Sequence, residues 1–253
     1  GRSRFTLSTL PASEFPSVEE TPGELSLEIS QASVKRLIER TAFAMAQQDV
    51  RYYLNGMLLE IRSGRLRMVA TDGHRLALCT APDPVDAGDA AVIIPRKGVL
   101  ELARLLEGEE SIRLVIGSNH VRAVNTQYTF TSKLVDGKFP EYERVLPKSP
   151  DKSVVGDRLA LKQAFTRTAI LSNEKYRGVR LKLSNDTLEI TANNPEQEQA
   201  EEMVSVDYQG AELEVGFNVS YLLDVLSVLN GSQVRLSLAD SASSALLEEA
   251  EAG

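Results

Sequence analysis

Hydrophobic residues along the chain follow two different periods. Leu25, Leu27 and Ile29 occupy every second position, which predicts a half-buried strand. After Ser30, a good N-cap residue, apolar side chains recur every three to four positions, which predicts a helix that begins at residue 31. The same two periods predict a second helix over 96–107 and strands around 57–62, 66–71, 91–94, 112–116, 121–124 and 128–134.

The second half of the chain repeats this pattern. The run 66–72 resembles 188–194 at an offset of 122 residues, and Gly56 and Gly178 share that offset. Collinear matches at one offset indicate two copies of one structural unit. The repeat predicts helices at about 157–170 and 219–229 and strands near 178–183 and 187–192.

The ends of the chain continue the repeat. Residues 5–16 resemble 130–140, where the first unit closes. We therefore interpret 1–20 as the last strand and linker of a preceding unit and 21–147 as a whole unit. We interpret 148–253 as a further unit that stops before its last strand. The pattern predicts a piece of a protein with at least three repeats.

Charge is distributed unevenly. The chain has 28 Lys and Arg against 36 Asp and Glu, a net charge of −8, with −1 in 1–147 and −7 in 148–253. An acidic total argues against indiscriminate binding of nucleic acid. Three of the four predicted helices nevertheless carry net positive charge. If these helices line one surface, they would contact phosphates without reading bases.

The composition is that of a globular chain in a reducing compartment. No apolar run approaches the roughly 18–20 residues that span a bilayer, and the first residues lack the apolar core of a signal peptide. Cys79 is the only cysteine, which excludes an intrachain disulfide. One cysteine and two histidines are too few for a dedicated zinc site. We expect a cytoplasmic protein with no cofactor and no bound metal.

The segment 71–75 is the one that most resembles a catalytic site. Asp72 and His74 beside Gly73 suggest a metal-dependent phosphoesterase as an alternative function. A β-turn explains the same residues more simply, because Asp and Gly supply turn geometry. The acidic run 196–202 suggests a metal site less well than it suggests a solvated or interface face. With no phosphate-binding or serine-nucleophile motif, we predict no catalytic residue.

Five segments carry a resemblance to a known family. They are DVRYYLNGM (49–57), ATDGHRL (70–76), TSKLVDG (131–137), AILSNEK (169–175) and GFNVSY (216–221). In this order they resemble the bacterial DNA sliding clamps, the beta subunits of DNA polymerase III. The resemblance implies an α+β fold of repeated domains, each with two helices packed on antiparallel sheets, arranged in an arc that forms part of a ring. Of the family's three domains, this chain would hold the exit of the first, the second and most of the third.

The resemblance also implies a function without catalysis. The ring would encircle duplex DNA of any sequence and hold the replicative polymerase on its template. The candidate DNA-facing residues are Lys35, Arg36, Arg40, Arg51, Arg96, Lys97, Arg158, Lys162 and Arg167. The full-length protein would close as a homodimer, for which the matching positions are Ile170, Leu171, Glu196 and Glu198.

The family binds short peptides of DNA polymerases, the clamp loader and repair proteins in a groove between its second and third domains. The positions that match this groove are Leu54, Thr71, Gly73, His74, Arg75, Leu76, Pro140, Arg144, Val145, Asn218, Tyr221 and Ser244. We expect Leu54, Leu76 and Val145 to form an apolar floor. Arg75 and Arg144 would hold polar or acidic groups at the rim.

Overall fold

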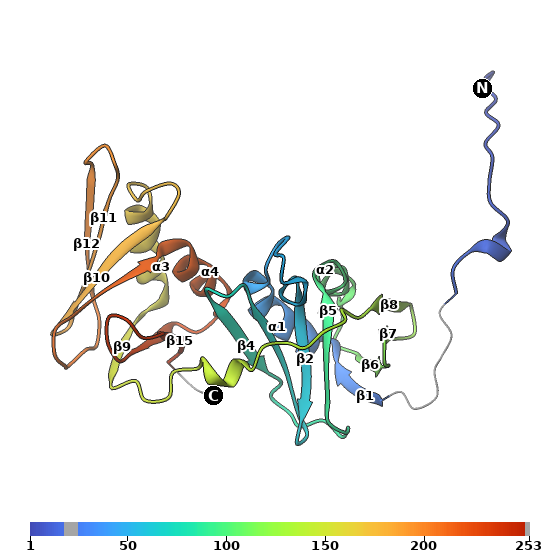
Figure 1. Cartoon of the computed structure of the whole chain (residues 1–253), viewed down its shortest axis with the longest axis horizontal. Coiled ribbons are helices and arrows are strands. Elements are labelled where there is room, and N and C mark those ends of the chain that lie inside the picture. The colour runs from blue at the N-terminus through green and yellow to red at the C-terminus, as the bar shows by residue number, and fades with distance from the viewer. Residues whose placement is uncertain (18–24, 251–253) are drawn as a thin grey trace.

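The computed structural model describes residues 1–17 and 25–250. Two units lie side by side along the long axis of the molecule (Figure 1). The first contains β1 (Leu25–Ser30), α1 (Gln31–Thr41), β2 (Gly56–Arg62), β3 (Arg65–Thr71), β4 (Leu76–Thr80), β5 (Ala90–Pro95), α2 (Arg96–Leu105), β6 (Ser111–Ile116), β7 (His120–Val124) and β8 (Thr129–Lys133). The second contains β9 (Lys152–Asp157), α3 (Arg158–Ala169), β10 (Gly178–Ser184), β11 (Thr187–Asn193), β12 (Gln199–Ser205), β13 (Leu213–Asn218), α4 (Val219–Val228), β14 (Gln233–Leu238) and β15 (Leu246–Glu249).

Each unit holds two antiparallel sheets with the same connectivity. The first unit has the orders β4-β3-β2-β5 and β1-β6-β7-β8, and the second has β12-β11-β10-β13 and β15-β14-β9. The second unit thus repeats the first strand by strand, up to the counterpart of β8. The predicted α+β class, with two helices packed on antiparallel sheets in each unit, is confirmed.

Local sequence explains where the helices begin. Ser30 accepts a hydrogen bond from the Ser33 amide at 3.1 Å, and Asp157 accepts one from Ala160 at 2.7 Å. These side chains satisfy amides that have no partner within the helix. Pro95 precedes α2 without a side-chain cap, where its fixed φ suits the extended residue before a helix.

Each unit has its own hydrophobic core between sheets and helices. In the first, Leu37 of α1 and Leu102 of α2 pack with Leu59 and Met68 of the sheet. In the second, an equivalent core includes Phe165, Leu181, Ile190 and Leu222. Burial of each such side chain contributes roughly 1.5–3 kcal/mol, so each unit has the material for an independent core.

Cys79 belongs to the first core, as expected for a packed thiol. Burial raises the pKa of this thiol, although Arg36 and Arg40 oppose the shift. A thiol that resists ionisation is a poor nucleophile, which indicates a structural role for Cys79.

The segment between the units crosses the outer face of the first unit's sheet (Figure 1). Phe139 and Tyr142 of this linker pack on Leu58, Val69 and Ile93 and form a third, smaller apolar cluster. Because the linker covers this face, the sheet is buried on both sides.

The predicted strand in 1–20 is absent from the described part of that segment, residues 1–17, so this prediction is wrong for these residues. They form one 3-10 turn, Ala12–Glu14, and otherwise extend away from the first unit. Phe5 is 85% exposed. A strand forms only against a neighbouring strand, and none is offered to this segment. Positions 18–20 of the predicted linker lie outside the described residues.

No helix within the described ranges is both long and apolar enough to cross a membrane.

Candidate groove and cationic face

The turn between β3 and β4 is held by its own side chains. Thr71 donates its hydroxyl to the Arg75 carbonyl at 2.7 Å and accepts from the Gly73 amide at 3.1 Å. Asp72 accepts from the amides of His74 at 2.9 Å and Arg75 at 3.0 Å. The Asp72 carboxylate is therefore committed to the turn, as the β-turn interpretation predicts. Across the described residues, no three His, Cys, Asp or Glu side chains are placed to hold a metal ion.

The backbone conformation at residue 73 favours glycine. Its φ of +90° lies in the left-handed region, and a Cβ there would lie 3.0 Å from the Arg51 guanidinium. Arg51 forms a bidentate pair with Asp49 and donates to the Asp72 carbonyl at 3.3 Å. Arg51 is among the residues predicted to face DNA. The structure instead places it beneath this turn, with the groove positions.

Arg75 joins the two units. Its guanidinium forms an ion pair with Asp224 of α4 and lies 4.6 Å from the centre of the Tyr221 ring. On its own unit it donates to the Phe43 carbonyl at 2.9 Å and pairs with Asp72 at 3.2 Å. Charge-assisted bonds and cation–π contacts of this kind fix a side chain in place. The Arg75 side chain therefore crosses the boundary and is bonded to residues of both units. We call Arg75 with these contacts the bracket.

A second ion pair joins the units on the helical side. Arg40 of α1 donates to Glu249 of β15 at 2.8 Å, and both side chains are largely buried. The same carboxylate oxygen accepts from the amides of Asn230 and Gly231. These bonds, with Arg40 the largest cause, lower the pKa of Glu249 from 4.5 to about 2.

This ion pair predicts an acid-sensitive contact. A lowered pKa means that the folded chain holds the ionised form, so the contribution to stability is complete above about pH 4.5 and is lost as the pH falls through 2. We expect Glu249→Gln to lower the free energy of unfolding by about 1–2 kcal/mol at pH 7 and to leave it nearly unchanged below pH 2, as measured by urea denaturation. Glu248→Gln, on the same strand, is the control. An equal loss at both pH values would contradict the assignment.

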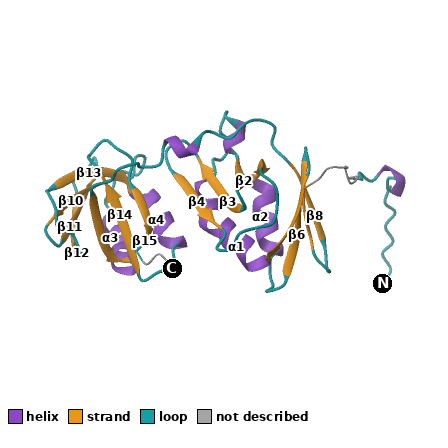
Figure 2. Cartoon of the chain, turned by 90° about the horizontal axis from the view of Figure 1, so that it is seen from below, coloured by secondary structure: helices purple, strands orange, loops and turns teal. Residues whose placement is uncertain are grey.

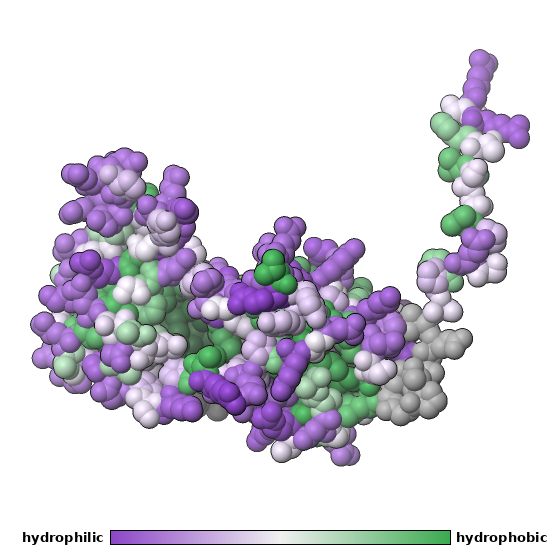
Figure 3. Space-filling view, in the orientation of Figure 1, coloured by the Kyte–Doolittle hydropathy of each residue, from purple (hydrophilic) through white to green (hydrophobic). Residues whose placement is uncertain are grey.

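The linker brings further predicted groove positions to the same boundary. Val145 is 58% exposed, and Arg144 pairs with Glu141 at 2.6 Å. Leu76 packs on the linker cluster with Phe139. Leu54 is only 2% exposed, so almost none of its side chain reaches the surface. Its place in the apolar floor of the groove stays a prediction. Figure 3 shows hydrophobic surface in the hollow between the units.

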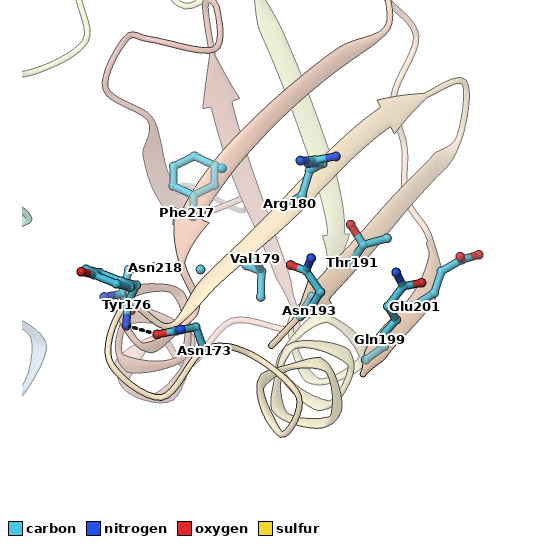
Figure 4. A pocket seen from close by; sticks show the side chains of 14 residues that line it. Asn173, Tyr176, Val179, Arg180, Thr191, Asn193, Gln199, Glu201, Phe217 and Asn218 are labelled. Carbon is cyan, nitrogen blue, oxygen red and sulfur yellow. Dashed lines mark hydrogen bonds between the residues drawn. The ribbon is translucent and has the colours of Figure 1, made fainter. Parts of the chain in front are cut away.

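Three predicted positions, Asn218, Tyr221 and Ser244, belong to the second unit. Asn218 caps α4 by accepting from the Ser220 amide at 2.9 Å, while Ser244 is exposed in the connection between β14 and β15. Asn218 also lines an open hollow of about 710 Å³ on the outer face of β10–β13 (Figure 4). Tyr176 stands at the same end of this hollow, with its amide bonded to Asn173.

The predicted cations fall into two classes. Arg40 and Arg167 pair with Glu249 and Glu202, and Arg158 donates to the carbonyls of Leu226 and Gly231. In the described part of the chain, no carboxylate lies within ion-pair distance of the remaining five helix cations, which are Lys35, Arg36, Arg96, Lys97 and Lys162. The four helices lie toward one side of the molecule, opposite the linker (Figure 2). This side therefore carries the unneutralised positive charge.

The four positions predicted for a homodimer are in the second unit. Ile170, at the end of α3, is 76% exposed and Leu171 is half-buried. Glu196 and Glu198 are exposed between β11 and β12, where Glu198 accepts from the Asn194 amide group at 2.6 Å. The apolar pair and the acidic pair thus come from different connections of the same unit.

Sequence reasoning missed several partners of these residues. Phe43 and Asp224 hold Arg75, and Glu249 holds Arg40, yet none belongs to a motif. Asp224 lies 149 residues from Arg75 along the chain. No local pattern signals such pairs, because tertiary packing brings them together: within the first unit for Phe43, and between the two units for Asp224 and Glu249.

Comparison with known proteins gives consistent matches. The family model for the DNA polymerase III beta subunit, central domain, matches residues 28–141, and that for its C-terminal domain matches 143–253. The chain is 67% identical over 252 residues to the beta sliding clamp of Pseudomonas putida, covering 99% of this chain and 69% of the relative.

Solved structures agree with these matches. A Pseudomonas aeruginosa sliding clamp with ligand is 64% identical and superposes with a TM-score of 0.95, covering all of this chain and 70% of that one. A second P. aeruginosa clamp, bound to griselimycin, is 65% identical with a TM-score of 0.93, and the match covers all of this chain and 69% of that one.

Proposed function

Because this chain belongs to the family of bacterial DNA sliding clamps, the beta subunits of DNA polymerase III, we propose that it acts as a non-catalytic processivity factor. In this role it contributes part of a ring around duplex DNA and binds peptides of partner proteins between two domains. The observation that carries the proposal is the boundary between the units. There Arg75 extends from the β3–β4 turn to α4, and Val145 is exposed on the linker. Cations that have no ion-pair partner among the described residues lie on the helical side.

The domain assignment is part of this proposal. Residues 1–20 would leave the first clamp domain, 21–147 would form the second, and 148–253 would form the third without its last strand. The family-model matches over 28–141 and 143–253 support these limits. So do the two separate cores.

The helical side is suited to contacts that let the protein slide along DNA. Phosphate contacts carry no sequence information, and long, hydrated cations exchange them readily. Lys35, Arg36, Arg96, Lys97 and Lys162, which have no carboxylate within ion-pair distance among the described residues, are available for such contacts. Paired residues such as Arg40 and Arg167 contribute less, because a carboxylate already neutralises them. The net charge of −8 repels phosphates from the other surfaces.

The groove suits a short peptide with an apolar anchor. DNA polymerases, the clamp loader and repair proteins are the partners we propose for it, in the cytoplasm. Val145 and Leu76 offer apolar contact, and Arg144 offers a cation at the rim. In the full-length protein, Ile170, Leu171, Glu196 and Glu198 would contact the partner subunit of a homodimer.

The groove assignment predicts a specific loss of ligand affinity. We expect Val145→Asp to weaken the binding of griselimycin, the ligand of the P. aeruginosa relative, by about 2 kcal/mol, because the bound ligand would bury a carboxylate in place of an apolar side chain. Calorimetric titration at 25 °C measures it. The control is Leu100→Asp, at an exposed leucine of α2 outside the groove. Unchanged affinity in the Val145 variant, or an equal loss in the control, would refute the assignment.

A further inference from the structure

A buried polar network fastens the linker to the first unit. Tyr142 donates its hydroxyl to Glu60 of β2 at 2.6 Å and accepts from Arg67 of β3 at 2.9 Å. Glu60 is only 6% exposed, and Arg62 pairs with it at 3.3 Å. Glu143, next to Tyr142, accepts from Arg62 at 2.9 Å. Both linker residues are thus bonded to the strands beneath them.

Glu60 lies at a position of β2 where an apolar side chain would be expected. Leu58 and Glu60 are two positions apart on β2, so they share the outer face, and Leu58 packs in the linker cluster. A buried carboxylate is costly unless cations and hydrogen bonds satisfy it. The tyrosine is suited to satisfy it, because burial and the bond to Glu60 raise the pKa of Tyr142 and keep its proton in place.

The anchored residue begins the turn that carries the groove's linker positions. Tyr142–Arg144 forms a single 3-10 turn, in which the Val145 amide bonds to the Tyr142 carbonyl at 3.1 Å. Pro140 accepts from the Tyr142 amide at 2.7 Å. Arg144 and Val145 themselves are exposed and held by little else. Their position therefore depends on where the Tyr142 ring is fixed.

We propose that Glu60 and Tyr142 are positioning residues for peptide binding: their buried hydrogen bond holds the 140–145 segment at the groove. This inference rests on the proposed function of the groove. Neither side chain needs to touch the ligand. Without the bond, ligand binding would have to order this segment, and that entropic cost would lower affinity.

The test compares two tyrosines that each lose one hydroxyl. Tyr142→Phe removes the bond to Glu60, and Tyr128→Phe removes a 2.9 Å bond to the Leu105 carbonyl far from the groove. In titrations with griselimycin at 25 °C, we expect Tyr142→Phe to bind about tenfold more weakly and Tyr128→Phe to stay within about twofold of wild type. Glu60→Gln keeps an acceptor for the hydroxyl and should retain most of the affinity, whereas Glu60→Ala should lose as much as Tyr142→Phe.

Amide hydrogen exchange supplies a readout that general destabilisation would not reproduce. In Tyr142→Phe, exchange should accelerate at 142–146 and stay unchanged in the two cores. Equal affinities of the Tyr142→Phe and Tyr128→Phe variants, or full affinity in Glu60→Ala, would overturn the inference while leaving the groove in place. Failure of the wild-type chain to bind griselimycin would instead count against the proposed function itself.

Discussion

Replacing Arg75 with alanine is expected to weaken griselimycin binding about a hundredfold and to lower the free energy of unfolding by about 3 kcal/mol. The guanidinium lies against Tyr221 and Phe43 and pairs with Asp72 and Asp224. Without the guanidinium, the carboxylates of Asp72 and Asp224 would lose the cation that they share. The contact between the β3–β4 turn and α4 would be lost with it. Titration calorimetry and urea denaturation measure the two effects.

Two further variants serve as controls for Arg75→Ala. Arg75→Lys keeps the charge but not the planar fork, so it should restore less than half of the binding free energy that Arg75→Ala removes. Arg180→Ala breaks an exposed 3.0 Å pair with Glu214 and should change stability by less than about 1 kcal/mol. If Arg75→Ala and Arg180→Ala change the free energy of unfolding equally, the bracket does not stabilise the contact between the units.

Sequence periodicity predicted most helices and strands of the first unit, because apolar spacing and capping residues are local features of the sequence. The helix from residue 31 and the strands after it follow from apolar spacing and from the Ser30 cap. The repeat predicted α3, α4, β10 and β11 of the second unit for the same reason, whereas β9, β12, β13, β14 and β15 were not predicted. The strand expected in 1–20 did not form, because a strand depends on a neighbour that sequence spacing does not supply.

The candidate site was only partly predictable. The turn at 71–76 was recognisable, since Asp72 and Gly73 are turn residues. The role of Arg75 in joining the two units was not predictable, because its partner Asp224 is distant in sequence. The burial of Leu54 was not predictable either, because a match to a groove position does not determine how many residues pack around the side chain. Charge counting could not separate Arg40, which pairs with Glu249, from Arg36, which has no ion-pair partner in the part of the chain that the structure describes.

The two faces of the chain respond to different physical variables. The groove depends on a bracket and a buried network that salt screens weakly, whereas exposed cations act through phosphate contacts that salt screens strongly. Ligand binding in the groove should therefore be nearly independent of ionic strength, and any DNA binding should not.

This difference in salt dependence predicts a large effect of helix charge on DNA affinity. Neutralising Arg36, Lys97 and Lys162 to glutamine is expected to reduce the affinity of the chain for duplex DNA on the order of a hundredfold at about 0.1 M salt. Removing one phosphate contact should lower the slope of log K against log salt by about 0.9, so the slope should fall by about 2 to 3 in the triple variant. Fluorescence anisotropy with two unrelated duplexes measures it, and both sequences should respond equally.

The matched control removes the same three charges elsewhere. Arg167 already pairs with Glu202, and Arg180 and Lys182 lie on the outer sheet of the second unit. Changing these three to glutamine alters the net charge equally but should leave the salt slope within about 0.5 of wild type. Because long-range attraction depends on total charge and phosphate contact depends on position, equal slopes in the two triple variants would show that no particular surface meets DNA. A slope change confined to the helix variant would locate the contact on α1, α2 and α3, the side where the cations remain unpaired.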